Sequence, residues 1–221
     1  MLIETGSRFV MTGDSVTDCG RAQPLGERPF GGLGTGYPAL VDSLLAISYP
    51  ERKIRATNTG VSGNTSKDLL ERWESDVLAL APGGWASAMI GINDVWRRLD
   101  SVCMADAHVS AEQYAANIAK MAQSAHGAGI RLLLLSPVFI ESRRDDEMRK
   151  MADECAAACK EAARKHSGTA IYVDVQSDFD AYLRSRNSND LSWDRVHPNQ
   201  TGHMIIARAI LKAIEYDWEL G

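Results

Sequence analysis

One residue near the start of the chain and two near its end carry the groups needed for nucleophilic attack on an ester. Ser15 supplies a hydroxyl on the turn after an apolar run, and His197, near the other end of the chain, can accept its proton. Asp194, three residues before that histidine, can bind the other ring nitrogen and fix the tautomer. We therefore predict acyl transfer through a covalent intermediate, with Ser15, Asp194 and His197 as the catalytic residues.

The same chemistry needs hydrogen-bond donors for the oxygen that becomes negative when the ester is attacked. The backbone N–H groups of Ser15 and Gly63 can serve, because a glycine lets the chain approach a ligand closely. The side-chain amide of Asn93 is a third candidate. The predicted oxyanion hole consists of Ser15, Gly63 and Asn93.

Four further residues near these positions are candidates for substrate binding: Asp14, Trp96, Arg97 and Trp193. An indole can stack on a sugar face or close a small acyl pocket, although packing is the alternative for both tryptophans. A solvated face is the alternative for Arg97. Asp14, like Asp94, can instead hold a loop through backbone N–H groups.

The elements that must position these residues follow a regular order of short apolar runs and longer helical patterns. Near-continuous apolar runs are typical of parallel strands buried on both faces. We expect five strands, at Arg8–Thr12, Lys53–Thr57, Ala86–Ile90, Arg131–Ser136 and Ala170–Val175. We expect helices at Tyr37–Ile47, Ser66–Leu80, Ala111–Ser124, Asp146–Lys165 and Gly202–Trp218.

This order predicts one α/β domain over residues 1–221, with a parallel sheet between helices. Each block of chemically competent residues follows a strand, so the blocks meet where the carboxyl ends of the strands lie, the usual ligand site of such sheets. Gly20–Gly36 and Asp180–Asp194 are expected to be irregular loops at this edge.

The composition excludes several classes of protein. The net charge of −5 over 221 residues does not favour binding to nucleic acid, and the apolar runs are too short to span a membrane. The N-terminus has no secretory signal pattern, so a cytoplasmic location is expected.

The four cysteines do not have the spacing of a disulfide framework or a zinc site. Cys155 and Cys159 are expected to be buried on one helix face.

With these residues in this order, the sequence resembles the SGNH hydrolases, also called GDSL esterases. The residues that name the family match Ser15, Gly63, Asn93 and His197, with Asp194 as the third member of the triad, and the order is kept across nearly the whole chain. The first block reads GDSVT in place of GDSL, which leaves the nucleophile unchanged. The resemblance implies a flavodoxin-like three-layer α/β/α sandwich, a shallow open active site, and neither metal nor cofactor.

A narrower resemblance, to the bacterial acetyl xylan esterases within this family, rests on Thr12–Ala22, Gly32–Tyr37, Gly91–Arg97 and Trp193–Ala207. It implies removal of acetyl groups from acetylated xylo-oligosaccharides or similar sugars, often inside the cell, and assembly as a homo-oligomer. The segment Asp100–His108 can serve as an interface or as a loop.

Other functions remain open at this point. A thioesterase, a lysophospholipase or a broad short-chain carboxylesterase would use the same triad. A non-catalytic carbohydrate-binding protein is disfavoured because the set of reactive residues is intact. A nucleotide-binding protein is disfavoured because the turn after the first strand lacks a glycine-rich phosphate cradle.

Overall fold

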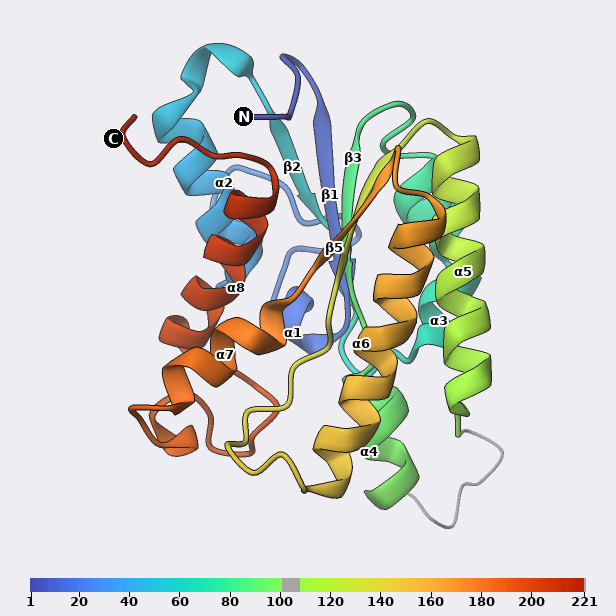
Figure 1. Cartoon of the computed structure of the whole chain (residues 1–221). Coiled ribbons are helices and arrows are strands. Elements are labelled where there is room, and N and C mark those ends of the chain that lie inside the picture. The colour runs from blue at the N-terminus through green and yellow to red at the C-terminus, as the bar shows by residue number, and fades with distance from the viewer. Residues whose placement is uncertain (101–107, 221) are drawn as a thin grey trace.

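Five parallel strands form the centre of the computed structural model, which describes residues 1–100 and 108–220 (Figure 1). The strand order is β2-β1-β3-β4-β5, so β1 and β3 lie side by side in the interior of the sheet. Met11 of β1 is paired in parallel register with Asn58 of β2 on one side and with Ser87 of β3 on the other. The strands are β1 Arg8–Gly13, β2 Arg55–Asn58, β3 Trp85–Met89, β4 Arg131–Leu135 and β5 Ala170–Val173.

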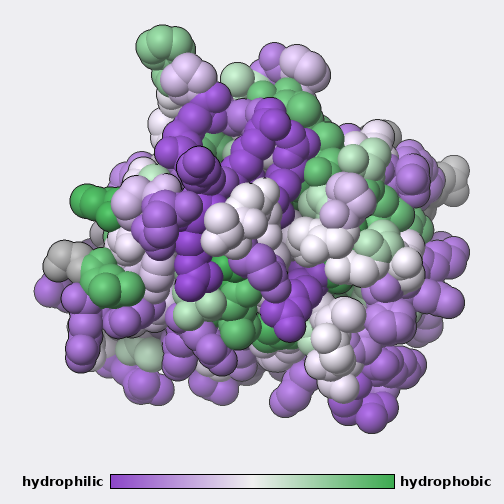
Figure 2. Space-filling model, turned by 90° about the horizontal axis from the view of Figure 1, so that it is seen from above, coloured by the Kyte–Doolittle hydropathy of each residue, from purple (hydrophilic) through white to green (hydrophobic). Residues whose placement is uncertain are grey.

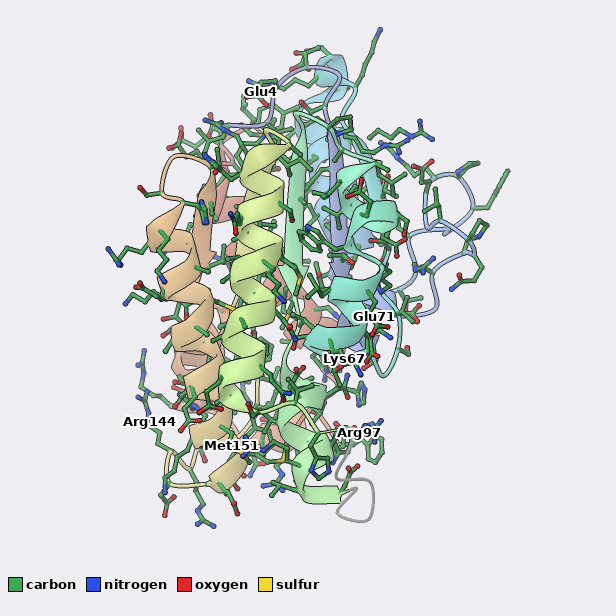
Figure 3. All side chains as sticks on the ribbon, turned by 90° about the vertical axis from the view of Figure 1, so that its right-hand side faces the viewer. Glu4, Lys67, Glu71, Arg97, Arg144 and Met151 are labelled. Atoms are coloured by element: carbon green, nitrogen blue, oxygen red, sulfur yellow. The ribbon has the colours of Figure 1, made fainter. Side chains whose placement is uncertain are left out.

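Helices cover both faces of this sheet, as the predicted three-layer architecture requires. One face carries α2 (Tyr37–Ser48), α7 (Val175–Leu183) and α8 (Gln200–Ala213); the other carries α3 (Ser66–Glu71), α5 (Ala111–Gly127) and α6 (Glu147–Lys165) (Figures 1 and 3). The leucines of β4 alternate between the two cores. Leu133 and Leu135 pack with α2 and α8, whereas Leu132 and Leu134 pack with α5 and α6. The predicted α/β fold is confirmed.

The long helices form where apolar side chains recur at helical spacing behind a capping residue. In α5, Tyr114, Ile118 and Met121 are buried, and Ser110 caps the first turn in a reciprocal arrangement with Gln113. In α6, Cys155 and Cys159 are both buried on the core-facing side, as expected from their spacing.

Two predicted helices end earlier than expected. The helix expected over Ser66–Leu80 is interrupted: α3 ends at Glu71, and a separate π-helical turn occupies Glu74–Leu78. The last helix begins at Gln200 and ends at Ala213, before Trp218. Glu215 then adopts a left-handed conformation that turns the chain away, and the backbone N–H of Tyr216 satisfies a carbonyl of the last turn.

Three α-helices within the described residues were not predicted, and the first is the four-residue α1 (Ser15–Asp18) after β1. The short α4 (Ile92–Asp100) begins directly after the turn at Gly91, and α7 occupies the start of the segment Asp180–Asp194 that was expected to be irregular. Asp174 caps α7 by accepting a hydrogen bond from the backbone N–H of Ser177. The segment Gly20–Gly36 is irregular, as expected.

The two ends of the sheet differ in character. The carboxyl ends of the strands lead into α1 (Ser15–Asp18) and α4, in the lower half of the molecule in Figure 1. The opposite end, seen from above in Figure 2, shows mostly hydrophilic side chains around smaller hydrophobic areas.

Within the described residues, no helix has the length and apolar character to cross a membrane. The expectation for Asp100–His108 concerns residues 101–107, which lie outside the described part of the chain.

Candidate active site

Ser15 is the first residue of α1, directly after the end of β1. Asp14 caps this short helix, since its carboxylate accepts a hydrogen bond from the backbone N–H of Val16 at 3.0 Å. Gly13 lies so close to β3 that a Cβ there would stand 2.2 Å from the carbonyl oxygen of Met89. A larger residue at that position would push the turn off the sheet, so the glycine allows the serine to sit at the edge.

The side chains of Ser15, His197 and Asp194 form one hydrogen-bonded chain. The Ser15 Oγ lies 2.8 Å from the His197 Nε2, and the His197 Nδ1 lies 2.6 Å from the Asp194 Oδ2. The His197 side chain is 38% exposed, so a small molecule can reach this chain of groups from solvent. The arrangement supplies a nucleophile, a base for its proton and a group that orients the base.

Asp194 is held in place by hydrogen bonds to its other oxygen. Its Oδ1 accepts from the Ser192 hydroxyl at 2.9 Å and from the backbone N–H groups of Val196 at 2.9 Å and His197 at 2.8 Å. Partial burial works to raise the pKa of Asp194, but the hydrogen bonds from His197, Val196 and Ser192 outweigh it and lower the pKa to about 2. The carboxylate is therefore ionised at neutral pH.

The loop that carries Gly63 is fastened to α1 and to the end of β1. Asp18 accepts hydrogen bonds from the Ser62 backbone N–H at 3.1 Å and from its hydroxyl at 2.8 Å, and the Val61 N–H donates to the Gly13 carbonyl. Gly63 itself is exposed and has a φ of +83°. Within residues 1–100 and 108–220, the backbone N–H groups of Ser15 and Gly63 donate no hydrogen bond, so both can donate to a ligand.

Asn93 lies at the start of α4, after the end of β3, and is buried. Its amide nitrogen donates to the carbonyl oxygen of Asn64 at 3.0 Å, which leaves its second N–H for another acceptor. The next residue, Asp94, accepts from the backbone N–H and the hydroxyl of Ser66. Burial outweighs these bonds and raises the pKa of Asp94 to about 6. Asp94 holds the start of α3 to α4, the structural role considered for it above.

The candidate substrate-binding residues occupy different environments. The Trp96 ring lies 6.1 Å from the His197 ring between centroids, and the Arg97 guanidinium lies 5.9 Å from the centre of the Trp96 ring. Trp193 is 85% exposed, directly before Asp194. Asp14 is 2% exposed beneath α1, which favours its role in holding the turn. Burial raises the pKa of Asp14 to about 7.

A second histidine lies behind the nucleophile and was not predicted as part of the site. His203, on α8, accepts a hydrogen bond at Nδ1 from the Tyr37 backbone N–H at 3.3 Å, which assigns its proton to Nε2, 3.4 Å from the Cys19 Sγ. The Cys19 Sγ lies 3.5 Å from the Ser15 carbonyl oxygen. Burial lowers the pKa of His203 to about 4, and so keeps the ring neutral. The sequence offers no signal for this contact, because the partners are more than 160 positions apart.

Arg72 and Asn64 were also missed, although they lie close to the predicted oxyanion groups. The Arg72 Nε donates to the Asn64 Oδ1 at 2.7 Å, and its Nη2 donates to the Gly13 carbonyl at 2.9 Å. Arg72 lies where the predicted Ser66–Leu80 helix is interrupted. In the sequence it is one of several charged residues in a helical pattern, so nothing distinguishes it from a solvent-exposed arginine.

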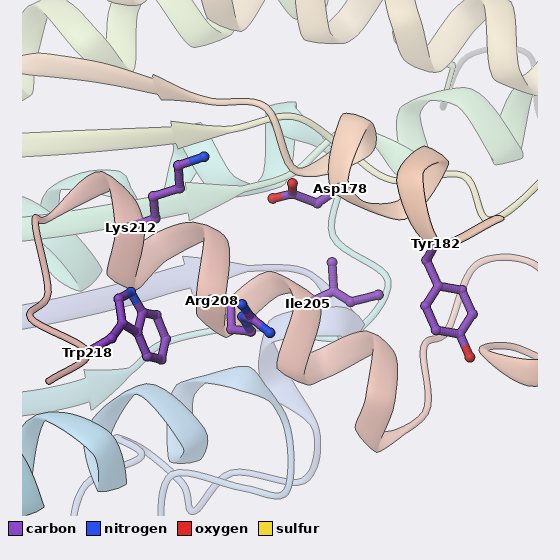
Figure 4. A pocket seen from close by; sticks show the side chains of 6 residues that line it. All are labelled: Asp178, Tyr182, Ile205, Arg208, Lys212 and Trp218. Carbon is purple, nitrogen blue, oxygen red and sulfur yellow. The ribbon is translucent and has the colours of Figure 1, made fainter. Parts of the chain in front are cut away.

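A cavity of about 390 Å³ lies away from this site, beside α7, α8 and the C-terminal segment (Figure 4). Its lining includes Tyr182, Arg208 and Trp218, and the Arg208 guanidinium stacks 5.6 Å from the centre of the Trp218 ring. Ser15, Asp194 and His197 do not line it. In the described residues, no group of three or more His, Cys, Asp or Glu side chains is arranged to hold a metal ion.

Comparisons with known proteins agree with this geometry. Residues 11–205 match the GDSL-like Lipase/Acylhydrolase family. The chain is 44% identical over 218 residues to an acetylxylan esterase from Geobacillus stearothermophilus, covering 99% of this chain and 98% of that protein. A crystal structure of the acetylxylan esterase from that organism superimposes with a TM-score of 0.94 at 43% identity, covering 99% of this chain and 98% of that one.

Other solved structures are similar over the same extent. An alpha/beta hydrolase enzyme from the metagenome of Lake Arreo, Spain, gives a TM-score of 0.92 at 40% identity, with 98% of each chain covered. Three structures of the Geobacillus enzyme are catalytic mutants, in which a serine, a histidine or an aspartate is replaced by alanine. The family match over most of the chain and the full-length relative lead to one conclusion: this chain belongs to the GDSL-like lipase/acylhydrolase family.

Proposed function

We propose that this protein is a serine esterase that removes acetyl groups from acetylated xylo-oligosaccharides or similar acetylated sugars. The observation that carries the proposal is the continuous hydrogen-bonded chain from Ser15 through His197 to Asp194. The 44% identity to an acetylxylan esterase over the whole chain supports the acetyl group and the sugar.

The mechanism follows from the positions of these groups. The Ser15 Oγ attacks the acetyl carbonyl carbon while the His197 Nε2 takes the hydroxyl proton. The Asp194 carboxylate stabilises the imidazolium that results. His197 then gives its proton to the departing sugar hydroxyl as the carbon–oxygen bond of the ester breaks. In the second half, His197 takes a proton from a water molecule, the water oxygen attacks the acetyl-serine, and acetate leaves as Ser15 is protonated again.

The negative oxygen formed in both halves needs donors already in place. We assign the backbone N–H groups of Ser15 and Gly63 and the second N–H of the Asn93 amide to this role. The loop of Gly63 is fastened to the end of β1 and to α1, and the Asn93 amide is fastened to Asn64 in the same loop. Donors that are preorganised in this way stabilise the transition state without reorganisation during the reaction.

The mutants of the Geobacillus relative support the same assignment. Its substituted aspartate and histidine are three positions apart, as Asp194 and His197 are here. A further mutant replaces the tryptophan that directly precedes that aspartate, the place that Trp193 takes in this chain. We propose Trp193 and Trp96 as the surfaces on which the sugar packs, with Arg97 beside Trp96. Assembly as a homo-oligomer, which the resemblance implies, stays a prediction, and so does a cytoplasmic location.

A comparison of substrates tests the proposal. We expect the protein to release acetate from acetylated xylo-oligosaccharides and from p-nitrophenyl acetate, and to have little activity on p-nitrophenyl octanoate. Faster hydrolysis of octanoate than of acetate would show a lipase or a lysophospholipase with the same triad. Trp193→Ala should raise KM for the acetylated sugar and leave KM for p-nitrophenyl acetate unchanged, because the small ester has no sugar ring to stack.

A further inference from the structure

One guanidinium contacts two of the three segments that carry the proposed oxyanion donors, and is linked to the third through Asn64. Arg72 follows α3 directly, and its side chain is 17% exposed. Its Nη2 donates to the Gly13 carbonyl at 2.9 Å, its Nη1 to the Thr59 carbonyl at 2.6 Å, and its Nε to the Asn64 side chain at 2.7 Å. Asp76 pairs with Nη1 at 2.7 Å and balances the charge.

These acceptors are next to the groups that would bind the oxyanion. Gly13 precedes the turn at Asp14 and Ser15 by one residue. Thr59 and Asn64 bracket the loop of Gly63. The carbonyl of Asn64 accepts the hydrogen bond of the Asn93 amide, so Arg72 holds the residue that orients this third donor. Thus Arg72 contacts β1 and the β2 loop directly, and acts on the start of α4 through one intermediate residue.

We propose that Arg72 is a positioning residue that sets the distances among the Ser15, Gly63 and Asn93 donors. The inference rests on the proposed function. The physical reason is the shape of the side chain. A guanidinium is planar and presents its donors in a rigid fork, so it fixes the directions of several acceptors at once. A lysine has one flexible ammonium and cannot reach the same acceptors with the same geometry.

Arg21 offers a matched control in the same region. Arg21 is buried, and like Arg72 it binds backbone carbonyls: its Nε donates to Gly60 at 2.6 Å, and its Nη1 donates to Ala22 and Pro24. Arg21 makes no hydrogen bond to Gly13, Asn64 or Asn93. Because Arg21 also holds the Gly63 loop, at Gly60, a loss of rigidity in that loop should follow either substitution. Misplacement of the Ser15 and Asn93 donors should follow only the Arg72 change.

The first experiment compares Arg72→Lys with Arg21→Lys, using Tm, kcat and KM for p-nitrophenyl acetate. We expect Arg72→Lys to lower kcat by roughly 10–100-fold with KM within about threefold, because small displacements of reacting groups cost about that much. The acid limb of the pH profile should stay in place, since Asp194 and His197 are not touched. Arg21→Lys should lower Tm and keep kcat within about threefold. Equal losses of kcat in the two variants would overturn the proposal.

A double-mutant cycle gives a readout that a purely structural role would not produce. If Arg72 acts through the oxyanion donors, its replacement should cost much less kcat in an Asn93→Ala background than in the wild type. Equal, additive costs in the two backgrounds would contradict the proposal. If Arg72→Lys does not fold, Asn64→Ser tests the same chain of contacts: lower kcat at unchanged KM supports it, and unchanged kcat refutes it.

The outcomes separate this inference from the proposed function. Loss of activity in Ser15→Ala together with additive effects of Arg72 and Asn93 would leave the esterase in place and remove the role of Arg72. Full kcat in Asn93→Ala would instead remove the assignment of the oxyanion donor itself.

Discussion

Asp194 binds His197 at two points, once through the backbone and once through the ring. Its Oδ1 accepts the His197 backbone N–H at 2.8 Å, and its Oδ2 lies 2.6 Å from the ring Nδ1. The carboxylate therefore fixes both the position of the residue and the rotation of the ring. With the Nδ1 proton directed at Asp194, the Nε2 that faces Ser15 is left as a proton acceptor.

Replacing this carboxylate by an amide should stop catalysis without unfolding the protein. In Asp194→Asn, an amide N–H can face Nδ1 and favour the tautomer that carries its proton on Nε2. That ring cannot accept the Ser15 proton, and kcat should fall by about 10⁴-fold. Steady-state kinetics on p-nitrophenyl acetate, with circular dichroism to verify folding, measure the effect. An Asp194→Asn variant with nearly full kcat would show that Asp194 does not set the tautomer.

The Asn93 amide should act on the rate rather than on binding. We expect Asn93→Ala to lower kcat by roughly 10²–10³-fold while KM changes little, as is found when one oxyanion donor is removed. Asn93→Asp is the matched control, because it keeps the size of the side chain and replaces the donor with an acceptor. An Asn93→Ala enzyme with wild-type kcat would contradict the assigned role.

The fold was largely predictable because its signals are local. The run of leucines in β4 indicates a strand buried on both faces, and the structure places alternate leucines in the two cores. The errors occur where a tertiary contact decides the outcome. The pattern of Ser66–Leu80 is helical throughout, yet the helix stops at Glu71, next to the residue whose side chain binds Gly13 and Thr59.

The site was predictable to the extent that its groups follow strands. Ser15, Asn93 and the loop of Gly63 lie at the carboxyl ends of β1, β3 and β2, which the topology brings to one edge. Arg72 and His203 have no such marker. Each acts through partners far away in the sequence, such as Tyr37 for His203 and Gly13 for Arg72, and no spacing reports these contacts.

The burial of His203 should make the folded protein less stable under mildly acidic conditions. Its pKa is lowered from 6.5 to about 4, because burial disfavours the charged ring. The stability that it contributes is fully present above pH 6.5 and declines as the pH falls toward 4, with a total loss of at most about 3 kcal/mol. Thermal unfolding from pH 7 to pH 4 measures this. His203→Gln should show a smaller decrease in Tm over that range, and an identical decrease would refute the assignment.

The burial of Asp14 should make the stability of the folded protein depend on pH in the opposite direction. Burial raises its pKa from 3.8 to about 7, so the folded protein bears the cost of a buried charge at pH 8 and is relieved of it toward pH 4. Asp14→Asn carries no charge and can still cap α1. The Tm of Asp14→Asn minus the Tm of the wild type should therefore be larger at pH 8 than at pH 4.5. A difference in Tm that does not vary with pH would show that burial does not raise the pKa of Asp14.

The most direct test is the nucleophile itself. Acetate release from acetylated xylo-oligosaccharides should be measured for the wild type and for Ser15→Ala, with equal Tm as evidence that both fold. We predict rapid release by the wild type, no release above background by Ser15→Ala, and labelling of the wild type alone by a fluorophosphonate probe. A folded Ser15→Ala protein that still releases acetate at the wild-type rate would contradict the account.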